Sequence, residues 1–62
     1  MTHPTTAEAI AYVTSIETSW GLTPRIVAVG IDHQNEGLPL ITTADNIWTV
    51  WFQPDGTLYG EC

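Results

Sequence analysis

The sequence contains no lysine and a single arginine, Arg25, so nearly all of its charge is negative. Seven acidic residues against that one base give a formal net charge of −6 at pH 7. Proteins that bind nucleic acid gain affinity from lysine and arginine side chains that neutralise phosphates, and polybasic membrane anchors use the same side chains. The composition therefore excludes an ordinary nucleic-acid binder and a polybasic anchor, and we expect no direct contact with nucleic acid or membrane.

Long apolar runs and cysteine pairs are also missing. No stretch approaches the roughly 20 apolar residues that a membrane-spanning helix needs, and the start of the chain lacks the basic and apolar segments of a secretion signal. We therefore expect a cytoplasmic protein. The only cysteine, Cys62, excludes an internal disulfide framework and a cysteine-based zinc site.

The acidity itself indicates which partners the chain favours. A protein of this charge is attracted to basic surfaces and associates with them faster at low salt. The alternative is that the charge only keeps a small domain soluble. A DNA duplex as long as a domain of this size would present roughly 16 anionic groups. Seven acids fall short of that number, so mimicry of DNA is not favoured.

The first third of the chain has the pattern of a helix. Thr5 and Glu8 stand at the spacing of a capping box, in which each side chain accepts a hydrogen bond from the other residue's backbone N–H. Gly21 suits the left-handed position after a helix, and Pro24 forbids continuation. Apolar residues follow helical spacing between these signals: Ala9, Val13, Ile16 and Trp20. The pattern predicts a helix over residues 6–20.

The middle of the chain reads as two strands and two turns. Arg25–Asp32 has apolar residues on both faces, which favours an inner strand over an edge strand. Residues 33–37 form a loop, and Leu38–Thr43 can form another strand. Pro39 has no N–H to donate, so it places this second strand at an edge, or itself lies at the strand's start. Residues 43–46 form the next turn.

The last segment predicts a β-hairpin. Ile47–Gln53 and Thr57–Glu61 are strands around Pro54-Asp55-Gly56, which fits a three-residue loop with Gly56 in the left-handed position. This loop sets the register of the opposed pairs: Gln53–Thr57, Phe52–Leu58, Trp51–Tyr59, Val50–Gly60 and Thr49–Glu61. Side chains alternate between the two faces. The apolar face, predicted to pack on the helix, carries Trp48, Val50, Phe52 and Leu58, with Gly60 leaving room for the helix backbone or a large ring.

These elements predict an α+β fold: one N-terminal helix packed on one face of a three- to four-stranded, mostly antiparallel sheet. We expect one small domain over residues 1–62, with residues 1–4 as a flexible N-terminus. A helix, a strand and a closing hairpin with W-T-V-W-F-Q-P-D-G-T-L-Y loosely resemble PepSY-type small domains, which have a leading helix and a sheet ending in a D-G turn. That resemblance spans most of the chain and rests on common turn and strand chemistry.

The face of the sheet that the helix leaves open is the candidate binding site. Trp51 and Tyr59 oppose each other there, and tryptophan and tyrosine dominate binding hot spots. We predict a partner-binding surface composed of Trp51, Tyr59, Ile47, Thr49 and Glu61. Two alternatives remain open: the aromatic pair only stabilises the hairpin, or the faces are reversed and Trp48 is the exposed indole.

Three loop and turn carboxylates, those of Asp32, Glu36 and Asp55, are expected to steer the chain towards a basic partner. Asp32, His33 and Glu36 also bring oxygen and nitrogen ligands together, but their spacing matches no recognised metal motif, so we expect no metal. Ser15 and Ser19 have no apparent partnering base, and Cys62 has no cationic neighbour. A core this small also leaves little room for a ligand-sized pocket. We therefore expect no enzyme and no cofactor.

The sequence thus favours a small acidic protein that inhibits a larger, basic protein by covering part of its surface. Nucleic-acid machinery exposes cationic grooves of the required kind, and a phage or mobile-element counter-defence inhibitor has this size and charge. An antitoxin, immunity protein or adaptor is equally compatible. The alternative class is a homo-oligomeric structural domain that assembles through its open sheet face or through the strand edge near Leu40.

Overall fold

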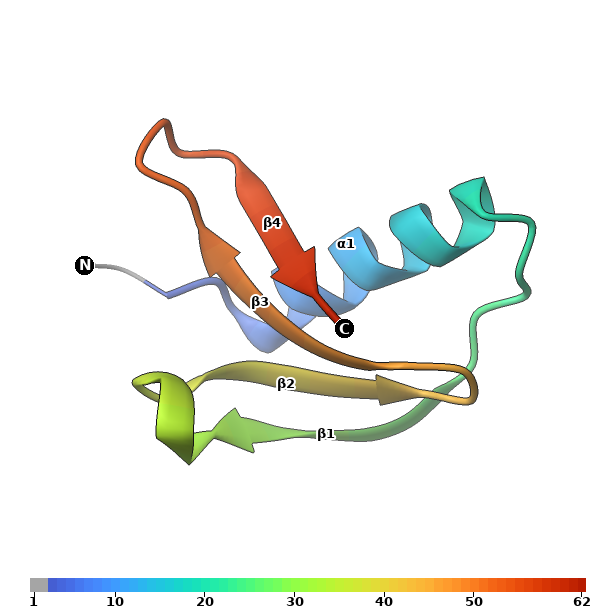
Figure 1. Ribbon diagram of the computed structural model, residues 1–62, viewed down its shortest axis with the longest axis horizontal. Coiled ribbons are helices and arrows are strands. Elements are labelled where there is room, and N and C mark those ends of the chain that lie inside the picture. Colours follow the sequence, from blue (N-terminus) through green and yellow to red (C-terminus); the bar gives the residue numbers. More distant parts are fainter. Residues whose placement is uncertain (1–2) are drawn as a thin grey trace.

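Helix α1 spans Thr6–Ser19 in the computed structural model, which describes residues 3–62 (Figure 1). The predicted capping box is confirmed at its start. The Thr5 backbone N–H donates to Glu8 Oε1 at 2.8 Å, and the Glu8 N–H donates to Thr5 Oγ1 at 3.1 Å. These two bonds satisfy backbone donors that the first turn of a helix leaves without partners.

The helix ends at the predicted glycine. Gly21 has a φ of 84°, and its N–H donates to the Thr18 carbonyl at 3.0 Å. The Leu22 N–H reaches back to the Glu17 carbonyl, also at 3.0 Å. This pair of bonds is a Schellman motif, which needs a residue that tolerates the left-handed conformation. The 14-residue helix is the length that these local signals set. Within the described part of the chain, no helix is both long enough and apolar enough to cross a membrane.

Four strands form one antiparallel sheet in the order β1-β2-β3-β4. They span Ile26–Asp32, Leu38–Thr43, Ile47–Phe52 and Leu58–Glu61, with a 3-10 turn over His33–Asn35 between the first two. The predicted α+β fold is confirmed, with a sheet of four strands. Pro39 is the second residue of β2, where it lies opposite Ile31, so its predicted place near a strand start is confirmed.

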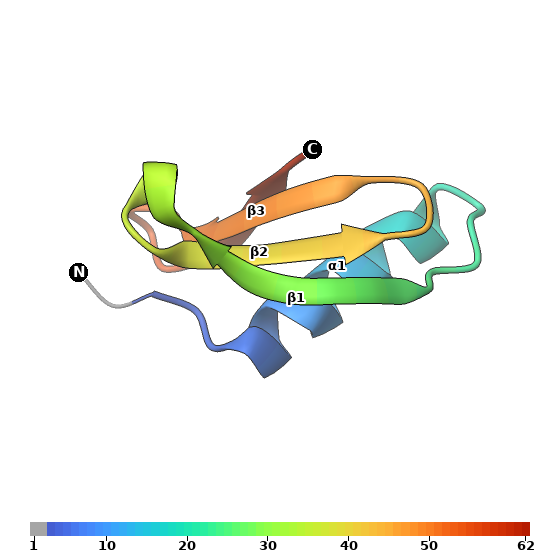
Figure 2. The ribbon, with the colours of Figure 1, turned by 90° about the horizontal axis from the view of Figure 1, so that it is seen from below.

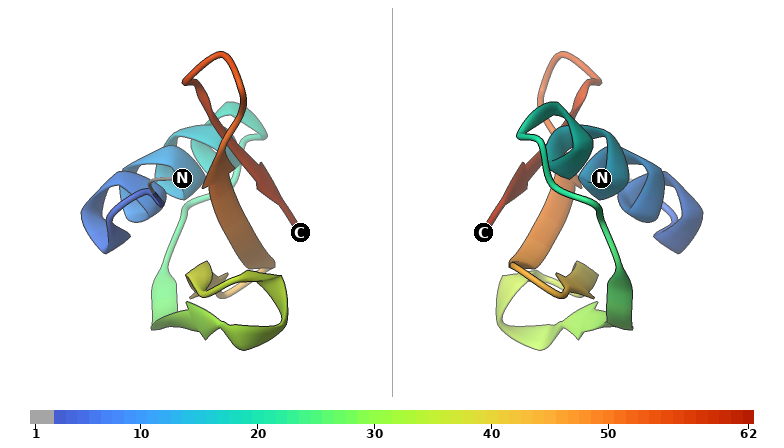
Figure 3. Two further views of the ribbon diagram at one scale, coloured as in Figure 1. Left: turned by 90° about the vertical axis from the view of Figure 1, so that its left-hand side faces the viewer. Right: turned by 90° about the vertical axis from the view of Figure 1, so that its right-hand side faces the viewer.

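The prediction of an inner strand over residues 25–32 is wrong. Strand β1 is the first in the sheet order and pairs only with β2, so one of its sides is an unpaired edge. Apolar residues on both faces indicated burial on both faces, but the single helix lies over β2, β3 and β4. Figure 3 shows α1 beside that part of the sheet and β1 at the far end. The apolar side chains of β1 therefore remain exposed.

The hairpin β3–β4 has the predicted register. Phe52 lies opposite Leu58, Trp51 opposite Tyr59, Val50 opposite Gly60 and Thr49 opposite Glu61. The turn closes as expected, because the Gly56 N–H donates to the Gln53 carbonyl at 2.8 Å and Gly56 has a φ of 87°.

The core lies between α1 and the face of the sheet towards which Trp48 and Val50 point. Its buried apolar residues are Ala9, Val13, Ile41, Trp48 and Val50. Gly60 is also buried, and a Cβ atom added there would lie 2.9 Å from Tyr12 Cε2 and 3.1 Å from Trp48 Cε3. The predicted close approach of a large ring at Gly60 is thus confirmed. Trp20 ends the helical stripe but is 55% exposed, with its ring centroid 5.4 Å from that of Trp48.

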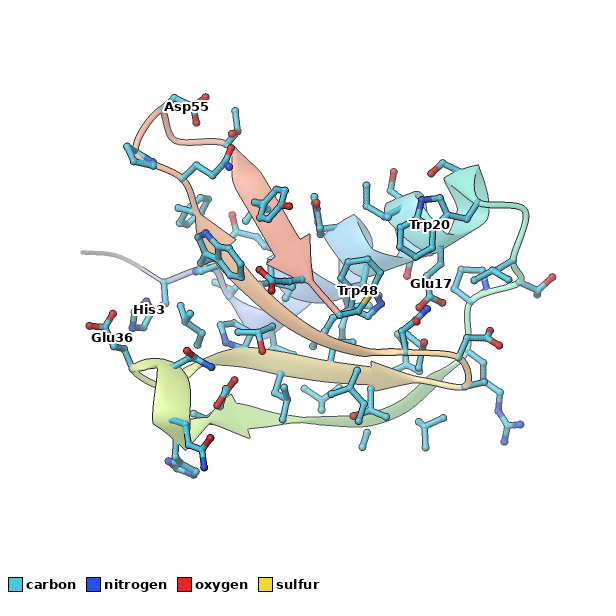
Figure 4. All side chains as sticks on the ribbon, in the orientation of Figure 1. His3, Glu17, Trp20, Glu36, Trp48 and Asp55 are labelled. Carbon is cyan, nitrogen blue, oxygen red and sulfur yellow. The ribbon has the colours of Figure 1, made fainter. Side chains whose placement is uncertain are left out.

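The segment before the helix runs beside the β1–β2 connection. His3 Nε2 lies 2.9 Å from the Glu36 carbonyl oxygen, and Pro4 is buried. Figure 4 shows His3 and Glu36 together at one end of the molecule. The N-terminus was expected to be flexible over residues 1–4. Positions 1 and 2 of that segment lie outside the described residues.

Candidate protein-binding face

The face of the sheet opposite the helix carries an open groove of about 670 Å³. Figure 2 shows α1 on one side of the sheet, with the other side of β2 and β3 uncovered. Residues from β2, β3, β4 and the β1–β2 connection line the groove, among them Glu36, Leu38, Ile47, Thr49, Trp51 and Glu61. Four of the five residues predicted to bind a partner therefore share one concavity.

The aromatic pair occupies this face as predicted. Trp51 is half-buried, and Tyr59 is 43% exposed. Their ring centroids lie 5.3 Å apart with an interplanar angle of 62°, an edge-to-face arrangement favoured by the ring quadrupoles. Ile47, further along β3, is 60% exposed. The Trp51 indole therefore packs against the Tyr59 ring and still lines the groove.

The reversed assignment of faces is wrong. Trp48 is only 2% exposed and lies in the core, where its Nε1–H donates to Glu17 Oε2 at 2.8 Å. The exposed aromatic surface of the hairpin therefore belongs to Trp51 and Tyr59.

The groove is larger than the size of the core led us to expect. The expectation that so small a domain leaves little room for a ligand-sized pocket concerned space inside the core, whereas this groove is open to solvent. Figure 3 shows the end of β4 and the β1–β2 connection on the same side of the twisted sheet. None of the buried core residues lines the groove.

The predicted steering carboxylates occupy three different settings. Glu36 is exposed at the groove, in the left-handed conformation with a φ of 60°. Asp32 is held inside the face: Asn35 Nδ2 donates to Oδ2 at 2.7 Å, Thr49 Oγ1 to the same atom at 2.9 Å, and the Gln34 N–H to Oδ1 at 3.2 Å. The hydrogen bonds from Asn35 and Thr49 are the main reason that the pKa of Asp32 lies below its usual range.

Asp55 lies apart from the groove, at the tip of the β3–β4 hairpin (Figure 4). Its Oδ1 accepts hydrogen bonds from the Thr57 backbone N–H at 3.0 Å and from Thr57 Oγ1 at 2.7 Å. These bonds lower the pKa of Asp55, so it is ionised at neutral pH. Asp55 contributes charge at the same end of the molecule as Glu36 but does not line the groove.

The residues considered for metal binding or nucleophilic chemistry do not converge. His33 is exposed in the 3-10 turn, while the Asp32 carboxylate is occupied by its three donors. Over residues 3–62, no three histidine, cysteine, aspartate or glutamate side chains form a cluster that could hold a metal ion. Ser19 donates to the Ile16 carbonyl at 2.6 Å, and Cys62 is an exposed free thiol.

Sequence reasoning missed one polar cluster, centred on Glu17. This side chain is fully buried, and its Oε2 accepts hydrogen bonds from Thr43 Oγ1 at 2.6 Å, Asn46 Nδ2 at 3.0 Å and Trp48 Nε1 at 2.8 Å. Figure 4 shows Glu17 beside Trp48. The available signal was spacing, because Glu17 follows Ala9 and Val13 at intervals of four on the buried side of α1.

Comparison with known proteins adds nothing to this geometry: no family model, curated protein or solved structure matches the chain.

Proposed function

We propose that this protein is a non-catalytic inhibitor that docks the open face of its sheet on a basic surface of a larger protein. The observation that carries the proposal is the groove, which is lined by Trp51 and Ile47 together with two acidic residues, Glu36 and Glu61. Exposed apolar surface with a polar rim is typical of a contact site. A net charge of −6 adds long-range attraction to a cationic partner.

An arginine or lysine side chain of the partner is the group that best fits this groove. The face of an indole attracts a cation by about 0.5–1 kcal/mol when exposed and by about 2 when desolvated. Glu61 and Glu36 supply carboxylates on the same surface, and an arginine can bind a carboxylate through two parallel hydrogen bonds. Proteins that handle nucleic acid expose such side chains in cationic grooves. The proposed targets are therefore enzymes of nucleic-acid machinery, as in counter-defence by phages or mobile elements.

The test is affinity capture at low salt from the cell in which the protein is made, using the wild type, Trp51→Ala and Thr18→Ala. Thr18 is exposed on α1 and lies outside the groove, so Thr18→Ala is the control. We expect the wild type and Thr18→Ala to retain the same basic protein and Trp51→Ala to lose it. The purified pair should then show a loss of affinity of about 30-fold or more for Trp51→Ala, the range of an interface hot spot.

Near-ultraviolet circular dichroism would show that Trp51→Ala keeps its core, since Trp48 and Trp20 report on it. Equal retention of the partner by folded Trp51→Ala and by the wild type would remove the groove from the interaction. Glu61→Gln separates the electrostatic part: we expect it to slow association and to weaken the dependence of the rate on salt.

A further inference from the structure

Strand β1 presents an edge that no other strand of the described chain pairs with and that α1 does not cover. Val27, Val29 and Ile31 are 60%, 45% and 55% exposed. Val29 lies opposite Ile41 and Ile31 opposite Pro39, and both partners are buried on the helix side of the sheet. The exposed row therefore lies on the same side of the sheet as the core, beyond the cover of α1.

Natural proteins prevent such edges from pairing with other chains. They do so by placing a lysine, a proline, an inward-pointing charge or a bulge in the edge strand. Strand β1 has no lysine and no proline, and its one ionisable residue is Asp32 at the end. A register shift does lie between Ile26 and Ala28, with Val27 as the extra residue, so the regular part of the strand runs from Ala28 to Asp32. This segment combines unpaired backbone groups with the exposed side chains of Val29 and Ile31.

We propose that two copies of this protein pair through β1, antiparallel, about a two-fold axis perpendicular to the sheet. Such an axis keeps each face of the sheet on its own side, so helix-side residues must oppose helix-side residues. Pairing centred on Val29 places Val29 opposite its counterpart and Ala28 opposite Gly30, and it brings Ile31 next to the bulge at Val27 of the other copy. The result is a continuous eight-stranded sheet. The exposed apolar side chains of the two β1 strands lie side by side on its helix side and shield each other from solvent.

The charges at the two ends of β1 favour a second copy over another partner. Arg25, the only arginine, immediately precedes the strand, and Asp32 ends it. Antiparallel pairing brings the end of β1 that follows Arg25 next to the end of the other copy that carries Asp32, so opposite charges come near each other twice in one interface. The remaining acids belong to other elements, so each copy brings one negative and one adjacent positive side chain to this edge.

This dimer would keep both open faces on one side of the sheet and both helices on the other. Two Trp51 grooves would then face the same way, and a partner with two cationic sites could engage both at once. The pairing itself stands on β1 alone and does not depend on what the groove binds.

The first test uses a cross-link that reads the register. Val29→Cys in a Cys62→Ser background places two thiols across the axis, where opposed Cα atoms in an antiparallel pair lie about 4.5–5.5 Å apart, within disulfide range. Ile47→Cys in the same background is the matched control, because Ile47 lies on the other face and is more exposed than Val29, at 60% against 45%. We expect the Val29→Cys dimer to form at least about tenfold faster on mild oxidation, as measured on non-reducing gels.

The second test measures association without a cross-link. In sedimentation velocity over a dilution series, we expect the wild type and Ile47→Lys to dimerise and Val29→Lys to stay monomeric, because a lysine in the middle of an edge opposes pairing. A monomeric wild type at every concentration would overturn the proposal. So would equal cross-linking rates for Val29→Cys and Ile47→Cys, or a Val29→Lys protein that dimerises as the wild type does. Should Val29→Lys fail to fold, the cross-linking rates decide.

Discussion

At the scale of single residues, Glu17 is the most demanding feature of the molecule. A fully buried carboxylate costs several kcal/mol to desolvate unless hydrogen bonds compensate. Three donors converge on Glu17 Oε2, while Oε1 is buried and has no partner in the structure. Burial raises the pKa of Glu17, and the hydrogen bonds from Thr43, Trp48 and Asn46 lower it further than burial raises it. Glu17 is therefore ionised at neutral pH and ties the end of α1 to the β2–β3 turn.

Replacing Glu17 should destabilise the fold even though the change is small. Glu17→Gln keeps one acceptor oxygen for the three donors but removes the charge that strengthens their bonds. We expect a loss of about 1–3 kcal/mol in the free energy of unfolding at pH 7, measured by urea denaturation. Glu36→Gln changes an exposed carboxylate and should stay within about 0.5 kcal/mol of the wild type. Equal stabilities for the two variants would contradict the role given to Glu17.

The pH dependence of this loss has a definite sign. Since the pKa of Glu17 is lower in the folded state than in the unfolded state, ionisation stabilises the fold at every pH above its ordinary pKa. That contribution is lost as the pH falls through the lower, folded-state pKa. Asp32 and Asp55 act in the same direction, so Glu17→Gln should flatten the acid side of the stability profile without abolishing its slope.

At the scale of elements, the hairpin was predictable and the position of β1 was not. The turn at Pro54–Gly56 fixes which residues of β3 and β4 oppose each other, and this register then decides that Trp48 points inwards and Trp51 outwards. The candidate site followed from that alternation. The apolar pattern of β1 is compatible with an inner strand and with an edge that associates with another chain. Only the order of strands in the sheet distinguishes the two.

The close packing of β4 on the helix side can be tested at Gly60. Gly60→Ala would place a Cβ atom 2.9 Å from the Tyr12 ring, which is too close for a real contact, and 3.1 Å from the Trp48 ring, which is unusually tight. We expect a loss of about 1–3 kcal/mol in the free energy of unfolding, because the rings or β4 must shift. Gly30→Ala is the matched control in β1, since no heavy atom lies within 4 Å of its added Cβ. A Gly60→Ala protein as stable as Gly30→Ala would show that the rings of Tyr12 and Trp48 do not pack closely against Gly60.

At the scale of the whole molecule, one helix cannot cover both faces and both edges of a four-stranded sheet. The open face, with the Trp51 groove, and the outer side of β1 are the two consequences. Net charge opposes uncontrolled association through these surfaces.

Removing that charge should therefore promote association. The sequence has an isoelectric point near 4.2, so acidification towards this pH brings the repulsion between chains close to zero. We expect light scattering to rise steeply towards pH 4.2 and Val29→Lys to scatter less than Ile47→Lys, which adds the same charge on the open face. Far-ultraviolet circular dichroism at each pH would confirm that the fold persists. Equal scattering by the two lysine variants would indicate that β1 is not the surface through which the chains associate.

The sequence by itself determined the features whose physical cause is local. The capping box, the glycine that ends α1 and the hairpin register each depend on bonds or backbone angles within a few residues, so the residue types fix them. The tertiary structure alone decided that β1 is an edge and which donors meet Glu17. Helical spacing places Glu17 on the same side of α1 as Ala9 and Val13, but its donors lie 26 to 31 residues away. The exposure of β1 depends on where α1 lies against the sheet. Both outcomes depend on which elements become neighbours in space, and no local pattern in the sequence encodes that.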